Sequence, residues 1–268
     1  MRKVYIVEGI PGSGKTTTAQ WLKDVLRDKG RDVRLFLEGN VDHPADYEST
    51  ACLTEDQLLG LEKDFTEIRH YAQKKETRYF IQYRKLPDSS SHLRKALKAY
   101  DVYELPVNEF IQVSLQKWKE FVEQAVNEDT VYVLECCFLQ NPITFLLAKH
   151  NCDKKQIAAY IKDISVIISE LNPAVLYFEQ DNVEESVGRV IKERSKEWLE
   201  FIIWYYTEQA YGQARGGVKG ESGFFAFLHE RKQLEKELLN VLPIESLVLN
   251  NSAFDWDERK REIISFIE

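Results

Sequence analysis

A glycine-rich segment near the N-terminus constrains the fold more than any other feature of the sequence. Residues 9–16 read Gly-Ile-Pro-Gly-Ser-Gly-Lys-Thr, directly after the strand-like run at residues 4–7 and directly before a helical pattern. A Gly-x4-Gly-Lys-Thr segment between a strand and a helix is typical of a phosphate-binding loop. Its glycines let successive N–H groups turn inward around an anion, and the helix N-terminus adds positive charge. We therefore predict a nucleoside triphosphate site formed by Gly9, Ile10, Pro11, Gly12, Ser13, Gly14, Lys15, Thr16 and Thr17.

Two side chains of this loop have predicted roles. Lys15 is expected to reach the β- and γ-phosphates and so to act in catalysis, and the Thr16 hydroxyl is expected to take one position on Mg²⁺. The predicted cofactors are therefore ATP and Mg²⁺.

Short apolar runs alternate with helical patterns along the chain, which predicts a parallel sheet covered by helices. Helices are expected at residues 15–29, ended by Gly30, and at about 255–267. The fold class is therefore α/β, a three-layer P-loop NTPase fold with a five-stranded parallel sheet, in one domain over residues 1–268. The expected strands are residues 3–8, 32–37, 131–135, 174–178 and 246–249.

Two long segments interrupt this alternation. Residues 40–130 read as mostly helical and are expected to form a substrate insertion. Residues 180–240 read as a helical lid region, apart from a glycine-rich stretch at 212–220 that is expected to be a mobile loop. Insertions at one sheet edge are where substrate and lid elements lie in open α/β folds. Within the first segment, helical patterns are strongest near residues 55–75, 90–100 and 107–127.

With these features the chain resembles the nucleoside and nucleotide kinases among P-loop proteins, in particular thymidylate-kinase-like proteins and deoxynucleoside kinases. Residues 173–178 followed by 183–190 are similar to that family's fourth strand and the helix leading into its lid. Residues 247–250 with 255–267 are similar to its closing strand and helix. The resemblance covers roughly half of the chain and gives residues 40–130 no counterpart. It implies phosphoryl transfer from ATP to a small molecule.

Two expected strands end in glutamate, at the sheet edge where ligands meet in such folds. In deoxynucleoside kinases the acid that ends the second strand accepts the proton of the substrate hydroxyl, and Glu38 matches that position. Glu135 matches the acid that holds Mg²⁺ through water, although Cys136 follows it where these relatives commonly have Asp-Arg. For both residues the alternative is a carboxylate that only ends a strand.

The predicted lid cations are Arg189 and Arg194, which the resemblance places just past the fourth strand. Such arginines would neutralise charge that develops during phosphoryl transfer. The alternative is a solvated helix face. Arg215 and Lys219 in the glycine-rich stretch offer another lid.

The candidate residues for contact with the acceptor lie in the segment after Glu38. Asp42 and His43 follow it directly, and His43 could either orient a substrate or cap a turn. Arg78 and Arg84 lie among aromatic residues that would suit a flat ring, although aromatic residues at helical spacing more often form a core.

Composition narrows the choice of partners. A net charge of −8 makes nucleic acid an unfavourable partner, and the strongest apolar run, residues 201–206, is far too short to span a membrane. A strand begins directly after residue 3, which leaves no room for a signal peptide, so a cytoplasmic location is expected. The sequence leaves open whether the chain forms a homodimer. The cysteines lack metal-ligand spacing and are expected to be free, mostly buried thiols: Cys52, Cys136, Cys137 and Cys152.

These observations predict an ATP-dependent phosphotransferase. Its acceptor would be a small molecule such as a nucleoside, a nucleotide or an antibiotic-like alcohol. The alternative is a P-loop protein that binds or hydrolyses ATP in a regulatory or conformational role, without a small-molecule acceptor.

Overall fold

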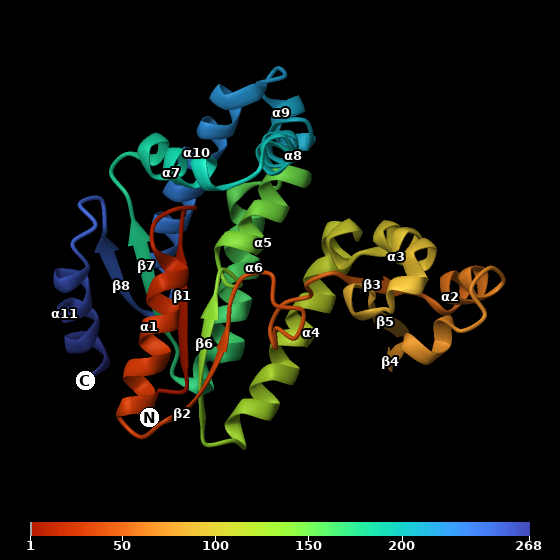
Figure 1. Cartoon of the computed structure of the whole chain (residues 1–268), viewed down its shortest axis with the longest axis horizontal. Coiled ribbons are helices and arrows are strands. Elements are labelled where there is room, and N and C mark those ends of the chain that lie inside the picture. Colours follow the sequence, from red (N-terminus) through yellow and green to blue (C-terminus); the bar gives the residue numbers. More distant parts are fainter. Residues whose placement is uncertain (1) are drawn as a thin grey trace. The chain divides into compact units, whose positions relative to one another are not determined.

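The computed structural model describes residues 2–268, which divide into two compact units (Figure 1). One comprises the chain up to Glu38 together with Trp118–Glu268, and we call it the sheet unit. The other is Gly39–Lys117, which we call the inserted unit. The helix α4 (Val107–Val126) contributes residues to both.

The sheet unit contains the predicted parallel sheet. Its strands have the order β2-β6-β1-β7-β8, and every neighbouring pair is parallel. The predicted strands and the α/β fold are confirmed, because each strand lies within one residue of its expected bounds. The strands are β1 (Val4–Gly9), β2 (Asp32–Phe36), β6 (Thr130–Glu135), β7 (Ala174–Glu179) and β8 (Glu245–Asn250).

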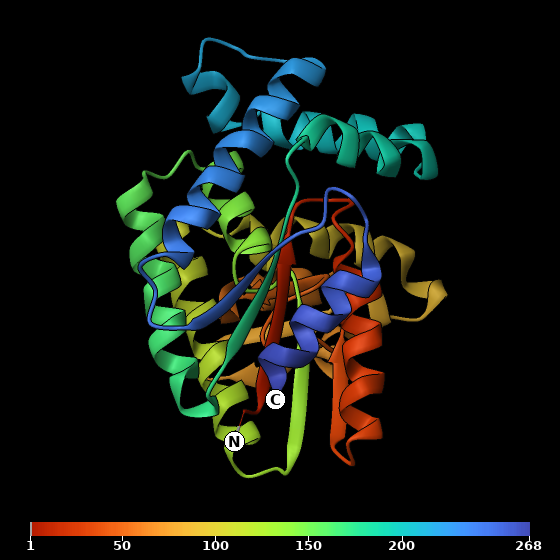
Figure 2. The ribbon, with the colours of Figure 1, turned by 90° about the vertical axis from the view of Figure 1, so that its left-hand side faces the viewer.

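Helices cover both faces of this sheet (Figure 2). On one face, α1 (Lys15–Asp28) and α11 (Trp256–Ile267) pack on alternate strand residues such as Val7 and Leu176. Continuously apolar strands suit this arrangement because both faces are buried. The helix α4 covers the other face together with several more helices of the sheet unit: α5 (Gln140–Thr144), α6 (Lys154–Ile167) and α10 (Gly220–Leu239).

The predicted lid region is helical, as expected. It contains α7 (Val183–Glu193), α8 (Lys196–Thr207) and α9 (Ala210–Ala214). The expectation of a mobile loop at residues 212–220 is wrong for the first of these residues, because Gly212 lies inside α9. There, a Cβ on Gly212 would come within 1.6 Å of the Thr207 carbonyl oxygen, so the close packing needs a glycine.

The inserted unit has helical segments where the sequence predicted them, near residues 55–75, 90–100 and 107–117, but it also has strands that the sequence did not predict. It contains an antiparallel sheet of order β3-β5-β4 beside short helices. These strands were missed because each is only three to five residues long and lies between helical patterns. Its elements are β3 (Thr50–Leu53), α2 (Glu55–Glu62), β4 (Gln73–Lys75), β5 (Arg78–Gln82) and α3 (Ser91–Leu97).

All of the cysteines are buried and free of disulfides, as predicted. Among residues 2–268, no helix is both long and apolar enough to cross a membrane.

Candidate functional site

The predicted phosphate loop connects β1 to α1. Gly12 and Gly14 have φ angles of 80° and 102°, in the left-handed region that favours glycine. A Cβ on Gly12 would lie 2.5 Å from the Ser186 carbonyl oxygen, and one on Gly14 would lie 2.3 Å from the Trp256 ring. Both the backbone angle and the available space therefore require glycine.

Residues far along the chain fasten this loop. Asn251, which is 1% exposed, donates from Nδ2 to the Ser13 carbonyl oxygen at 3.0 Å. Ser186 in α7 donates from Oγ to the Pro11 carbonyl oxygen at 3.2 Å. No local pattern indicates either contact, because it is the carboxyl ends of β7 and β8 that bring these residues to the loop.

Lys15 is the cation of the loop. It is 6% exposed, and its Nζ donates to the Ile10 carbonyl oxygen at 2.9 Å. An ammonium group has three N–H donors, so this contact leaves donors for phosphate oxygens. The next residues, Thr16 and Thr17, are exposed at the start of α1, beside the loop.

The structure brings together three residues that the sequence singled out. The Thr16 hydroxyl donates to Glu135 Oε1 at 2.6 Å, and the Glu38 backbone N–H donates to Glu135 Oε2 at 3.1 Å. Glu135 is only 2% exposed, so both of its carboxylate oxygens are fixed by hydrogen bonds in a buried place. The Thr16 hydroxyl and the Glu38 backbone N–H thus meet the Glu135 carboxylate near the carboxyl ends of β6 and β2, beside the glycine-rich loop.

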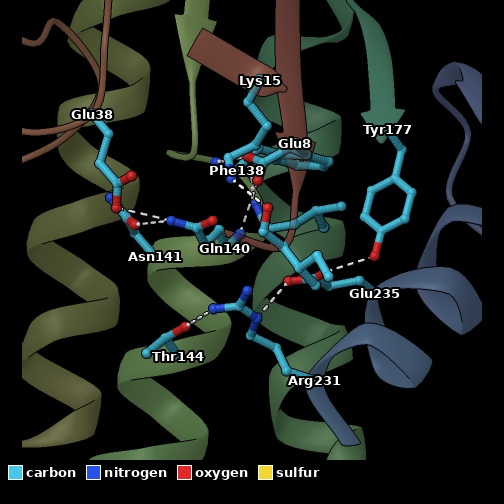
Figure 3. Close-up of polar contacts among 12 residues, drawn as sticks. Glu8, Lys15, Glu38, Phe138, Gln140, Asn141, Thr144, Tyr177, Arg231 and Glu235 are labelled. Carbon is cyan, nitrogen blue, oxygen red and sulfur yellow. Dashed lines mark hydrogen bonds and ion pairs between the residues drawn. The ribbon is translucent and has the colours of Figure 1, made fainter. Parts of the chain in front are cut away.

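The Glu38 side chain has a partner that sequence reasoning missed. Gln140, at the start of α5 and 6% exposed, donates from Nε2 to Glu38 Oε1 at 2.8 Å (Figure 3). The signal that could have found it is a polar side chain in the otherwise apolar run that follows Glu135. Gln140 orients one carboxylate oxygen of Glu38, while Glu38 as a whole is exposed.

Glu8, the residue before the loop, is a second buried carboxylate that the sequence analysis did not single out. It is fully buried and accepts three backbone N–H bonds, from Phe138, Leu139 and Gln140, at 2.8–3.0 Å (Figure 3). Burial raises the pKa of Glu8 to about 7, although these hydrogen bonds favour the ionised form. The turn after β6, in which Cys136 has a φ of 64°, therefore directs three backbone N–H groups at a titratable carboxyl group.

Behind the site lies a buried charged network from α10. Arg231 and Glu235 are both fully buried and form an ion pair at 3.1 Å. Glu235 accepts a hydrogen bond from the Tyr177 hydroxyl at 2.8 Å, and Arg231 donates to Thr144 Oγ1 at 2.8 Å (Figure 3). Loss of one partner in such a pair leaves an uncompensated buried charge.

The predicted lid arginines lie in and after α7. Arg189 pairs with Glu185 at 2.7 Å, and its guanidinium lies 3.9 Å from the centroid of the Phe254 ring. Arg194 is exposed, with its guanidinium 5.7 Å from the Trp198 ring centroid. Neither contact is with the phosphate loop, which α7 touches through Ser186 instead.

The alternative lid cations are both paired. Arg215 donates to Glu230 and to Asn151, each at 2.7 Å, and lies 3.7 Å from the Tyr211 ring centroid. Lys219 pairs with Glu208 at 3.0 Å on the surface. Arg215 is thus held by three neighbours rather than carried on a loose loop.

The candidate substrate residues all belong to the inserted unit. Arg78 pairs with Glu109, and Asp42 pairs with Lys85. Arg84 is exposed and lies 3.5 Å from a Glu48 carboxylate oxygen.

His43 is only 4% exposed, and its Nδ1 accepts the Ala45 backbone N–H at 3.2 Å. Burial lowers the pKa of His43 to about 4, so the ring is neutral at neutral pH. Two roles were expected for His43, and a hydrogen bond from the backbone two residues later is the kind of contact that a turn cap makes.

The residues beside the loop have the right chemistry for Mg²⁺. This ion prefers hard oxygen ligands and is usually bound by one or two protein groups with water and substrate phosphates. Thr16 and Glu135 offer such oxygens. Across residues 2–268, no group of three His, Cys, Asp or Glu residues has the geometry to hold a metal ion by itself.

The strand order and the phosphate loop after β1 define the three-layer P-loop NTPase fold. No family model matches the sequence, and no curated protein matches it. Among solved structures, one match is the deoxyadenosine kinase from M. mycoides with bound dATP, at 14% sequence identity and a TM-score of 0.43. The match covers 98% of this chain and 98% of that chain. We base the fold assignment on the strand order and loop of this chain.

The raised pKa of Glu8 predicts how stability depends on pH. An unfolded glutamate titrates near pH 4.3, so between about pH 4.5 and 7 the folded chain holds a proton that the unfolded chain has released. The free energy of unfolding should therefore fall as pH rises through this window, by up to about 3 kcal/mol, and level off above it. Glu8→Gln should remove this dependence.

The measurement is urea unfolding between pH 4.5 and 8 for the wild type, Glu8→Gln and the exposed control Glu123→Gln. The amide that replaces the carboxyl in Glu8→Gln changes stability equally at every pH, so only the slope of the difference with pH is diagnostic. A flat difference between the wild type and Glu8→Gln would show that Glu8 is ionised throughout.

Proposed function

We propose that this chain is an ATP-dependent phosphotransferase that acts on a small-molecule acceptor. The observation that carries the proposal is the cluster of Thr16, Glu135 and Glu38 beside the phosphate loop. A loop that only bound nucleotide would need no second carboxylate at the end of β2, held in place by Gln140.

The loop and Lys15 would hold the phosphates of ATP. Its N–H groups and the N-terminus of α1 supply positive potential, and the buried Lys15 ammonium adds a full charge. Mg²⁺ would be held by Thr16 and Glu135, and when bound it would neutralise charge on the transferred phosphoryl group. We include ATP and Mg²⁺ in the proposal on these grounds.

Glu38 would act as the general base. One of its oxygens accepts the Gln140 amide, so the other can accept the proton of an acceptor hydroxyl. Arg194, exposed after α7, would approach the transferring group only when the lid closes, with Arg189 in a lesser role. Asp42, His43, Arg78 and Arg84 stay proposed acceptor contacts of the inserted unit.

The first experiment asks whether the loop binds ATP. Lys15→Ala should remove most nucleotide affinity or turnover, because Lys15 is the cation that the loop directs at the phosphates. The measurements are equilibrium ATP binding and ADP release with pools of nucleosides, nucleotides and aminoalcohols, with the surface variant Lys29→Ala as control. Normal ATP binding and turnover in Lys15→Ala would refute the proposed function. ATP binding without ADP release from any pool would favour the regulatory alternative.

The metal assignment makes a separate prediction. Thr16→Val and Glu135→Gln should each raise the Mg²⁺ concentration for half-maximal activity, while nucleotide affinity without metal stays unchanged. The measurement is a Mg²⁺ titration of ADP release beside a metal-free binding assay. If the titration of Glu135→Gln overlays the wild type, Glu135 is not on the metal side, and Glu38 becomes the carboxylate to test.

Variants of Glu38 and Gln140 should distinguish the loss of the general base from the loss of the hydrogen bond that orients it. Removal of a general base typically costs about 10²–10⁴ in rate, so Glu38→Gln should lower kcat by that order while ATP affinity changes little. Gln140→Leu should lower kcat less, because the base remains but loses its hydrogen bond. Gln233→Leu, an exposed glutamine of α10, is the matched control. Full turnover in Glu38→Gln would mean that the base lies elsewhere or that the acceptor is itself a phosphate.

A further inference from the structure

The helix α5 begins without a cap from its own sequence. The first N–H groups of a helix lack partners inside it, and Leu139 at the N-cap position has no side-chain acceptor to offer them. Glu8 of β1 supplies the acceptor from 130 to 132 residues earlier in the chain (Figure 3). Its Oε1 accepts the N–H groups of Phe138 and Leu139 at 2.8 and 2.9 Å, and its Oε2 accepts the N–H of Gln140 at 3.0 Å.

Strand pairing places Glu8 at this turn. Tyr5 and Val7 of β1 belong to the core cluster that packs on α1, so Glu8 points to the opposite face of the sheet, where α5 lies. Because β1 and β6 are parallel neighbours, with Val7 opposite Glu135, the turn after β6 leaves the sheet beside the end of β1. The start of α5 is therefore tied to a strand of the sheet.

The Gln140 side chain has few contacts of its own to direct it. Its Nε2 donates to Glu38 Oε1 at 2.8 Å, and its contact with Asn141 Oδ1 is long, at 3.5 Å. Its Oε1 is buried and has no hydrogen-bond partner among residues 2–268. An amide that is held at one end only takes its direction from its backbone, and Glu8 holds that backbone. A shift of the Gln140 backbone would therefore move the amide away from Glu38.

We propose that Glu8 is a positioning residue for the general base Glu38 and acts on it through Gln140. In the described part of the chain no hydrogen bond joins Glu8 to Glu38 directly, so the effect passes through the turn and the Gln140 side chain. Glu8 also directly precedes Gly9, the first residue of the phosphate loop, so one carboxylate connects the start of the loop with the orientation of the base. This inference rests on the proposed function, which gives Glu38 its part in catalysis.

A double-mutant cycle tests the positioning role. Glu8→Gln keeps one oxygen for the Phe138 and Leu139 N–H groups but turns an amino group toward the Gln140 N–H, so Gln140 loses its backbone partner. Loss of one hydrogen bond changes a rate by about tenfold, so Glu8→Gln and Gln140→Leu should each lower kcat about tenfold. The double variant should also lose about tenfold, because both changes remove the same orientation, whereas independent effects would multiply to about 100-fold.

Thr130→Val is the matched control. Thr130 begins β6, is 4% exposed and donates to Asp32 Oδ2 at 2.6 Å, so its replacement also removes a buried hydrogen bond. It should lower the free energy of unfolding and leave kcat unchanged, both alone and in the Gln140→Leu background. ATP affinity should be unchanged in all of these variants. The assays are run at pH 8, above the pKa of about 7 that burial gives Glu8.

Crystal structures of the wild type and Glu8→Gln give a second readout, which needs no turnover. The hydrogen bond of 2.8 Å between Gln140 Nε2 and Glu38 Oε1 should be present in the wild type and lost in Glu8→Gln. Glu8→Asp keeps a carboxylate but is one methylene shorter, so it should lose the same bond. It replaces Glu8→Gln in both experiments if that variant does not fold.

An intact bond between Gln140 and Glu38 in these variants would overturn the positioning role. Losses in kcat that multiply, an unchanged kcat in Glu8→Gln, or an equal loss in Thr130→Val would also overturn it. Absence of turnover in the wild type with every acceptor pool would instead refute the proposed function, and the crystal structures alone would then show whether Glu8 directs Gln140.

Discussion

The parallel pairing of β6 with both β1 and β2 is the constraint on which the candidate site depends. Because β6 lies between these strands, Glu135 at its end reaches Thr16 after β1 and the Glu38 backbone after β2. A slip of one residue in either register would turn Glu135 to the other face of the sheet. The hydrogen bond of 2.6 Å between Thr16 and Glu135 is thus a product of sheet topology.

Buried charge is concentrated on the sheet face opposite α1. Glu8 is held by three N–H groups of the turn after β6, and that turn also delivers Gln140 to Glu38. The Arg231–Glu235 pair from α10 lies in the same layer. Burial of these groups is costly unless each is paired, so the network fixes one arrangement of β6, α5 and α10. The orientation of Glu38 follows from that arrangement.

The sequence predicted the parts of the fold in which local pattern and tertiary structure agree. The five parallel strands, α1, α4 and α11 appear where apolar runs and helix signals placed them. In the inserted unit it predicted the helical segments but missed the antiparallel sheet, in which β4 and β5 pair through a turn with Glu76 at φ 49°. It also treated Gly212 as part of a loose loop, because close packing against Thr207 leaves no mark on local composition.

The sequence by itself determined the conformation of the glycine-rich loop, since Gly12 and Gly14 carry backbone angles that few other residues adopt, and it marked Glu38 and Glu135 as carboxylates near strand ends. Only the tertiary structure decided which of these groups meet. Asn251 and Gln140 come from distant positions, and their neighbours depend on strand order and register. Local sequence specifies backbone angles and apolar faces, whereas contacts between distant side chains are fixed only when the whole core packs.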